Sequence, residues 1–132
     1  MITIVKSSVR SVDMDATEKL FIFIRKLMRF LEEEMGKDLM KVIYSSALDS
    51  KEHTYFLNSN RSLFLIIRSL IEEAKEQNDI GTDQSVNEIS QLITQSLMGI
   101  IYHWGLNNSE QSLESLSIPL TKTIINGLKT KN

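Results

Sequence analysis

The sequence predicts an all-α protein, an antiparallel bundle of about six helices in a single domain over residues 1–132. Two observations favour this fold class. Five glycines and one proline are few for 132 residues, which is typical of long helices rather than of many tight turns. Apolar residues also recur at intervals of three and four, the period of an amphipathic helix.

The composition excludes several classes of protein. The chain has no cysteine, which rules out disulfides, thiolate metal sites and thiol nucleophiles. Its net charge of −2 argues against nucleic-acid binding by this chain alone, because such binding needs a basic face. The longest apolar run, Leu63–Ile67, is far shorter than the roughly 20 residues of a membrane span. No signal peptide is recognisable, so we expect a cytoplasmic protein that does not contact membranes.

The N-terminal third predicts one long helix. Residues 2–12 combine β-branched side chains with a helical spacing, and we favour the end of a helix that enters from upstream. Asp15 and Glu18 resemble a capping box, which predicts a helix start there. The helix is expected to run to about Glu34 and to end at Gly36.

The middle of the chain predicts two further helices. Residues 37–48 read as a short helix and residues 49–59 as a polar loop. A longer helix is predicted from Arg61 to about Gln77, with Asn58 or Asn60 as its N-cap.

A helix from Ser85 to Trp104 is the most informative element. Ser85 and Glu88 form an S-x-x-E capping box. One stripe along this helix is large and apolar and suits the core: Val86, Ile89, Ile93, Leu97, Ile100 and Trp104. A second stripe is mostly small or half-polar: Leu92, Ser96, Gly99 and His103. Because small residues permit close approach of two backbones, the second stripe predicts packing against another helix.

The last helix is predicted from Ser112 to Asn126, after a loop over residues 105–109. Pro119 is expected either to kink this helix or to mark its first turn. Gly127 is predicted as its C-cap.

Motifs for catalysis or metal binding are absent from the sequence. Neither His53 nor His103 belongs to a Glu-x-x-His pair, and there is no P-loop and no Gly-x-Ser-x-Gly elbow. The acidic runs Glu32–Glu34 and Glu72-Glu73 are interpreted as solvated helix surface. We therefore predict no enzyme activity, no catalytic residue, no metal site and no cofactor.

Aromatic and aliphatic residues allow two interpretations. They form a solid core, or they leave a cavity for an apolar or aromatic ligand. The candidate ligand-binding residues are Phe23, Leu27, Tyr44, Tyr55, Phe56, Phe64, Ile67, Met98 and Tyr102.

The stretch from Gln77 to Trp104 resembles the C-terminal domain of TetR-type transcriptional regulators. The similar features are the turn at Ile80-Gly81, the cap at Asp83-Gln84-Ser85, the pair Gly99-Ile100 with Trp104, and the final Gly127-Leu128. The segment Asp13–Leu20 is similar to the start of the helix that follows the linker helix in this family.

This resemblance implies a homodimer in which the last two helices of each chain form a four-helix bundle. It also implies a small-molecule effector that controls DNA binding, with repression as the family default. The helix-turn-helix domain is expected upstream and is missing here, so residues 1–12 are expected to be the remnant of its linker helix. The implied dimer interface consists of Leu92, Ser96, Gly99, His103, Leu120, Thr123, Ile124 and Gly127.

Two other classes of function remain open on the sequence. The chain could be a stand-alone helical protein-interaction module without DNA-binding activity. It could also be a small helical enzyme or metal carrier, although no acid–base pair and no ligand cluster can be named. The effector, the operator and the sign of regulation are not specified by the sequence.

Overall fold

A computed structural model describes residues 14–36, 53–106 and 110–129, with backbone alone for residues 53–61. This part of the chain is all-helical, as predicted. Its elements are α2 (Ala16–Phe30), a π-helical turn (Leu31–Met35), α4 (His53–Glu76), α5 (Val86–Leu106) and α6 (Leu113–Leu128). The only extended pairing in the described residues is an isolated bridge between Ile80 and Lys129. The predicted helices over residues 1–12 and 37–48 lie outside the described residues.

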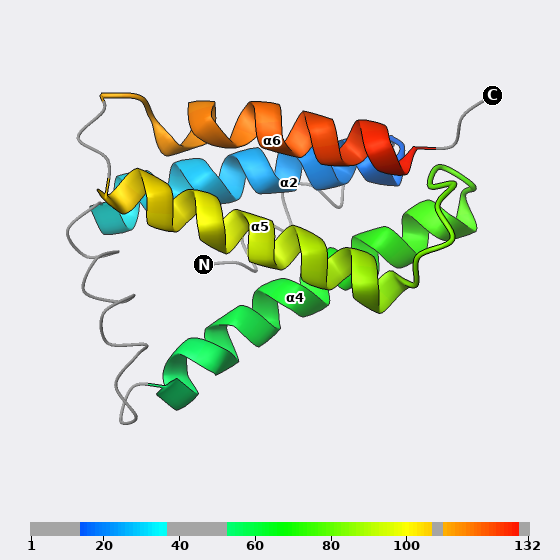
Figure 1. Ribbon diagram of the computed structural model, residues 1–132, viewed down its shortest axis with the longest axis horizontal. Coiled ribbons are helices and arrows are strands. Elements are labelled where there is room, and N and C mark those ends of the chain that lie inside the picture. The colour runs from blue at the N-terminus through cyan, green and yellow to red at the C-terminus, as the bar shows by residue number, and fades with distance from the viewer. Residues whose placement is uncertain (1–13, 37–52, 107–109, 130–132) are drawn as a thin grey trace.

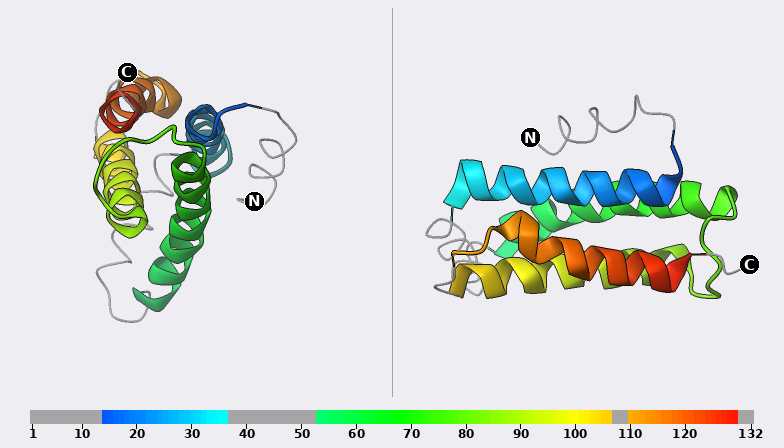
Figure 2. Two further views of the ribbon diagram at one scale, coloured as in Figure 1. Left: turned by 90° about the vertical axis from the view of Figure 1, so that its right-hand side faces the viewer. Right: turned by 90° about the horizontal axis from the view of Figure 1, so that it is seen from above.

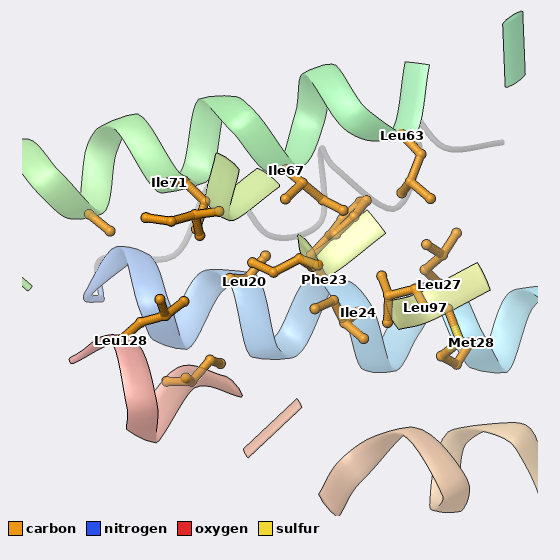
Figure 3. Packing of buried hydrophobic residues seen from close by; sticks show 14 of the residues in the cluster. Leu20, Phe23, Ile24, Leu27, Met28, Leu63, Ile67, Ile71, Leu97 and Leu128 are labelled. Atoms are coloured by element: carbon orange, nitrogen blue, oxygen red, sulfur yellow. The ribbon is translucent and has the colours of Figure 1, made fainter. Parts of the chain in front are cut away.

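The four long helices form two layers (Figure 1). Helices α5 and α6 lie side by side in one layer, and α2 and α4 form the other, as both views of Figure 2 show. Helix α2 packs on α4 and α6, and α5 packs on the same two helices. Phe23 of α2, Ile67 of α4 and Leu97 of α5 are almost completely buried in the core between the layers (Figure 3).

The start of α2 is capped by residues distant in sequence. Asp15 occupies the N-cap position, but its side chain accepts no capping hydrogen bond, so the predicted capping box is wrong. Instead, the Ala16 N–H donates to Oε1 of Gln77 at 3.1 Å, and the Thr17 N–H donates to Oδ2 of Asp79 at 3.3 Å. The turn that follows α4 therefore supplies the acceptors that free helix N–H groups require.

The end of α2 differs from the predicted continuous helix. The α-helix stops at Phe30, and one π-helical turn follows over Leu31–Met35. Gly36 then ends the element with a φ of +73°, a conformation that glycine adopts without steric cost. The predicted stop at Gly36 is confirmed, whereas the π-helical turn was not foreseen.

Helix α4 begins earlier than predicted. It starts at His53 rather than Arg61, so the predicted loop is wrong over residues 53–59, and Asn58 and Asn60 are interior residues rather than caps. Residues 53–60 contain no glycine or proline, so nothing in this segment interrupts a helix that tertiary packing supports.

Helix α5 begins as predicted and ends later. The Glu88 N–H donates to Oγ of Ser85 at 3.1 Å, and the Ser85 N–H donates to Oε1 of Glu88 at 3.2 Å, which confirms the capping box. The helix continues to Leu106, so Gly105 is a buried helical residue and not part of a loop.

Helix α6 starts directly after Ser112, within one residue of its predicted start, and extends beyond its predicted end. Oγ of Ser112 accepts from the Ser115 N–H at 3.0 Å. Pro119 lies inside the helix, beyond its first turn, and both Pro119 and Ser115 are exposed, so water can solvate the Ser115 carbonyl that proline leaves without a donor. Gly127 is helical too, and the C-cap is Lys129, so the predicted glycine cap is wrong.

Candidate functional site

Helix α5 has the two different faces that its sequence predicts. The apolar stripe faces the core: Ile89, Ile93, Leu97 and Trp104 are buried, and Val86 and Ile100 are half-buried. The second stripe points outward. Within it, Leu92 is 44% exposed, Gly99 and His103 are exposed, and Ser96 is half-buried.

The outward stripe of α5 lies on the side away from α4. Nε of Arg68 in α4 donates to Oδ1 of Asn87 at 2.8 Å, which identifies the side of α5 that faces α4. Ser96 follows Asn87 by nine residues, or two and a half turns, so it lies on the opposite side of α5. The stripe is therefore directed towards α6 and the solvent.

The α6 residues of the implied interface form a stripe on the side away from α2, in which Thr123 and Gly127 are exposed and Leu120 and Ile124 are half-buried. Lys122 and Lys129 border a groove between α6 and α2, which identifies the side of α6 that faces α2. Leu120 precedes Lys122 by two residues, or about 200° around the helix, and lies on the opposite side, towards α5. The two stripes are thus neighbours on the outside of one layer, and we call them together the α5/α6 face. It comprises Leu92, Ser96, Gly99, His103, Leu120, Thr123, Ile124 and Gly127.

The part of this face that α5 contributes is apolar and poor in charge. No Asp, Glu, Lys or Arg occurs from Ile89 to Ser109. Leu92 is the large apolar side chain of this stripe and is exposed, and α5 exposes two more beside the stripe, Tyr102 at 52% and Leu106 at 58%. Depletion of charge and enrichment in large apolar groups are typical of the centre of a protein–protein interface.

Packing among the described residues explains neither glycine of the α5/α6 face. A Cβ atom added to Gly99 or to Gly127 meets nothing within 4 Å. A glycine inside a helix costs roughly 0.5–1 kcal/mol relative to alanine. Since the described structure offers no reason for this cost, close approach of a second backbone is the natural explanation.

The candidate ligand-binding residues occupy different environments. Phe23, Leu27 and Ile67 come together in the core (Figure 3), whereas Tyr102 lies at the surface. Phe64 and Met98 are half-buried. Tyr44 lies outside the described residues, as do the side chains of Tyr55 and Phe56.

A clamp that the sequence did not predict joins α2 to α6. The Glu114 carboxylate in α6 accepts hydrogen bonds from Arg29 at 3.0 Å and from Arg25 at 3.3 Å. The hydrogen bond from Arg29 is the main cause that lowers the pKa of Glu114 below its ordinary value. Glu32 adds a further contact, because its Oε1 accepts from the Leu113 N–H at 2.6 Å and caps α6.

Glu32 is therefore not merely solvated helix surface, whereas Glu33, Glu34 and Glu72 are exposed as predicted, and Glu73 is half-buried and bonds Lys19. No local pattern indicates this clamp, because its partners lie more than 80 residues apart.

A groove of about 350 Å³ separates α2 from α6. It is lined by Thr17, Glu18, Phe21, Ile22, Arg25, Lys122, Ile125, Asn126 and Lys129. None of the candidate ligand-binding residues lines it. A weak sequence signal exists in the helical spacing of Lys122, Ile125 and Lys129, which marks a mixed basic and apolar side of α6.

Among the described residues, no group of three or more His, Cys, Asp or Glu is placed to hold a metal ion. Nor does this part of the chain contain a helix with the length and hydropathy to cross a membrane. Comparison with protein-family models, curated proteins and solved structures finds no match.

Proposed function

We propose that this chain is the effector-sensing and dimerisation domain of a TetR-type transcriptional regulator, a repressor by the family default. The α5/α6 face pairs two chains. A small apolar or aromatic molecule binds among the middle helices, and DNA binding belongs to a helix-turn-helix domain of the same polypeptide.

The observation that carries this proposal is the α5/α6 face. Two neighbouring helices present an outer surface whose α5 side is free of charge from Ile89 onwards, with the exposed Leu92 and two glycines that packing among the described residues does not require. Two copies of such a layer, packed face to face, make a four-helix bundle in which the glycines allow close contact.

The contact between α2 and the turn after α4 also supports a way for ligand binding to affect the segment that precedes α2. The chain enters α2 directly after Asp15, and the turn after α4 holds this point through Gln77 and Asp79. A ligand that displaces α4 relative to α2 therefore acts on the entry of the chain. Such a ligand regulates DNA binding only if its affinity differs between the two conformations, before and after the displacement of α4.

A second candidate is a stand-alone interaction module, because the α5/α6 face is equally suited to a partner of another sequence. Two observations distinguish the candidates. The regulator requires a helix-turn-helix in the reading frame upstream of Met1. It also requires that the complete polypeptide binds DNA as a dimer, with half-sites spaced by one helical turn or a multiple.

The direct test is a gel-shift assay with the complete polypeptide and the DNA upstream of its own gene. We expect a shift with the wild type and none with the Gly99→Leu variant, because tight binding to DNA requires two paired helix-turn-helix domains. A reading frame without a helix-turn-helix, or a DNA affinity that does not depend on Gly99, contradicts the regulator and leaves the interaction module.

A further inference from the structure

The groove between α2 and α6 has the volume of a small ligand site. Its volume of about 350 Å³ falls at the lower end of the range found for ligand pockets. Phe21, Ile22 and Ile125 provide an apolar lining. Phe21 and Ile22 are only half-buried, so part of their apolar surface is left for another molecule to cover.

The groove is basic although the chain as a whole is acidic. Arg25, Lys122 and Lys129 line it against one carboxylate, Glu18, whereas the chain carries a net charge of −2. Within the described residues, neither lysine has a carboxylate within ion-pair distance.

The charge of Arg25 is only partly compensated. Its Nε lies 3.3 Å from Oε2 of Glu114, but Arg29 shares the same carboxylate, so two guanidinium groups face one acid. The Arg25 guanidinium also lies 5.7 Å from the centre of the Phe21 ring, which places a positive charge beside the apolar lining.

We propose that this groove binds a small amphipathic carboxylate. Its aliphatic or aromatic body covers Phe21, Ile22 and Ile125, and its carboxylate is held by Lys122 and Lys129. Charge complementarity favours an anion, and the apolar lining favours an organic anion over an inorganic one. This inference does not depend on the assignment as a regulator, because the groove shares no residue with the α5/α6 face or with the candidate ligand-binding residues.

Binding to the groove has a structural consequence. A molecule that contacts both walls links the first half of α2 to the last turns of α6, and it stabilises their present separation by mass action. The competing explanation is that Lys122 and Lys129 only complement the carbonyl groups at the end of α6, which requires no ligand.

Titration of the ¹⁵N-labelled protein with octanoate tests the proposal. Octylammonium is the comparison, because it has an alkyl chain of similar length and the opposite charge. We expect saturable shifts in the amide signals of Phe21, Ile22 and Ile125 with octanoate, and a much weaker response with octylammonium. The double variant Lys122→Glu/Lys129→Glu is expected to reduce the affinity for octanoate by about tenfold or more, since two charge-assisted hydrogen bonds are lost.

The matched control is Lys26→Glu, which reverses an exposed lysine of α2 outside the groove and is expected to leave octanoate affinity unchanged. Circular dichroism verifies that all variants remain folded. Three results overturn the proposal: no saturable shift with octanoate, equal binding of octylammonium, or shifts centred on core residues such as Phe23. None of these results bears on dimerisation through the α5/α6 face, which is measured separately.

Discussion

One carboxylate oxygen of Asp79 accepts hydrogen bonds from both the backbone N–H and the hydroxyl of Thr17. This contact joins the turn after α4 to the first turn of α2, across 62 residues of sequence. The same turn reaches α6, because the Gly81 N–H donates to the Leu128 carbonyl at 2.8 Å. Ends of three helices therefore meet at residues 77–81.

Replacing Asp79 tests the importance of this junction. Asp79→Ala removes the acceptor of two hydrogen bonds, one of them a helix cap, and we expect it to lower the free energy of unfolding by about 1–3 kcal/mol. Urea denaturation measures the change. Asp83→Ala is the matched control, since Asp83 is exposed in the following loop, and its effect is expected to stay within about 0.5 kcal/mol. Equal effects of the two variants contradict the capping role of Asp79.

The clamp at Glu114 predicts a dependence of stability on pH. Its hydrogen bond from Arg29 holds the folded-state pKa below the ordinary value of 4.5. A carboxyl with a lowered folded-state pKa stabilises the fold above its unfolded pKa, and this contribution is lost as pH falls through the folded value.

The expected result is that Glu114→Gln is less stable than the wild type at neutral pH, and that the difference shrinks as pH falls below about 4.5. Thermal unfolding over a pH series measures it. Glu76→Gln serves as the control, because Glu76 is exposed at the end of α4. A stability difference for Glu114→Gln that does not change with pH disproves the ionic origin of the clamp.

The buried hydroxyl of Thr94 predicts a stabilising substitution. Thr94 is 7% exposed, and its Oγ1 has no hydrogen-bond partner within the described structure. Thr94→Val keeps the shape and removes an unpaired polar group, so we expect a gain of about 1 kcal/mol in the free energy of unfolding.

Thr121 provides the comparison for Thr94. It is equally buried, but its hydroxyl donates to the Ser117 carbonyl at 2.7 Å. Thr121→Val is therefore expected to be neutral or destabilising. A Thr94→Val variant that chemical denaturation shows to be less stable than Thr121→Val contradicts an unpaired hydroxyl at Thr94.

Features that depend on neighbouring residues could be predicted from the sequence. The Ser85 and Glu88 capping box, the stop at Gly36 and the two faces of α5 all follow from side chains within a few turns of one another. The α5 stripe of the candidate interface was identified in this way, because its side chains are mostly smaller or more polar than those of the core stripe at the same helical spacing.

Features that depend on distant partners could not be predicted. Asp15 has the sequence of a helix cap, yet Gln77 and Asp79 cap α2, because folding brings their side chains to the N–H groups of Ala16 and Thr17. Gly105 and Gly127 suggest helix ends, yet both helices continue through them. The groove likewise combines residues of α2 and α6 that only the fold brings together.

The mass of the protein in solution, measured by sedimentation equilibrium, tests the central claim that the α5/α6 face pairs two chains. We predict twice the chain mass of 15.1 kDa for the wild type and a monomer for Gly99→Leu. A Cβ atom at position 99 meets nothing within 4 Å among the described residues, and Gly99 is exposed, so the variant is expected to fold normally. Ser69→Leu, which adds the same side chain to an exposed position of α4, is expected to remain dimeric. A wild-type mass of one chain at every concentration, or a Gly99→Leu variant that still pairs, contradicts the account.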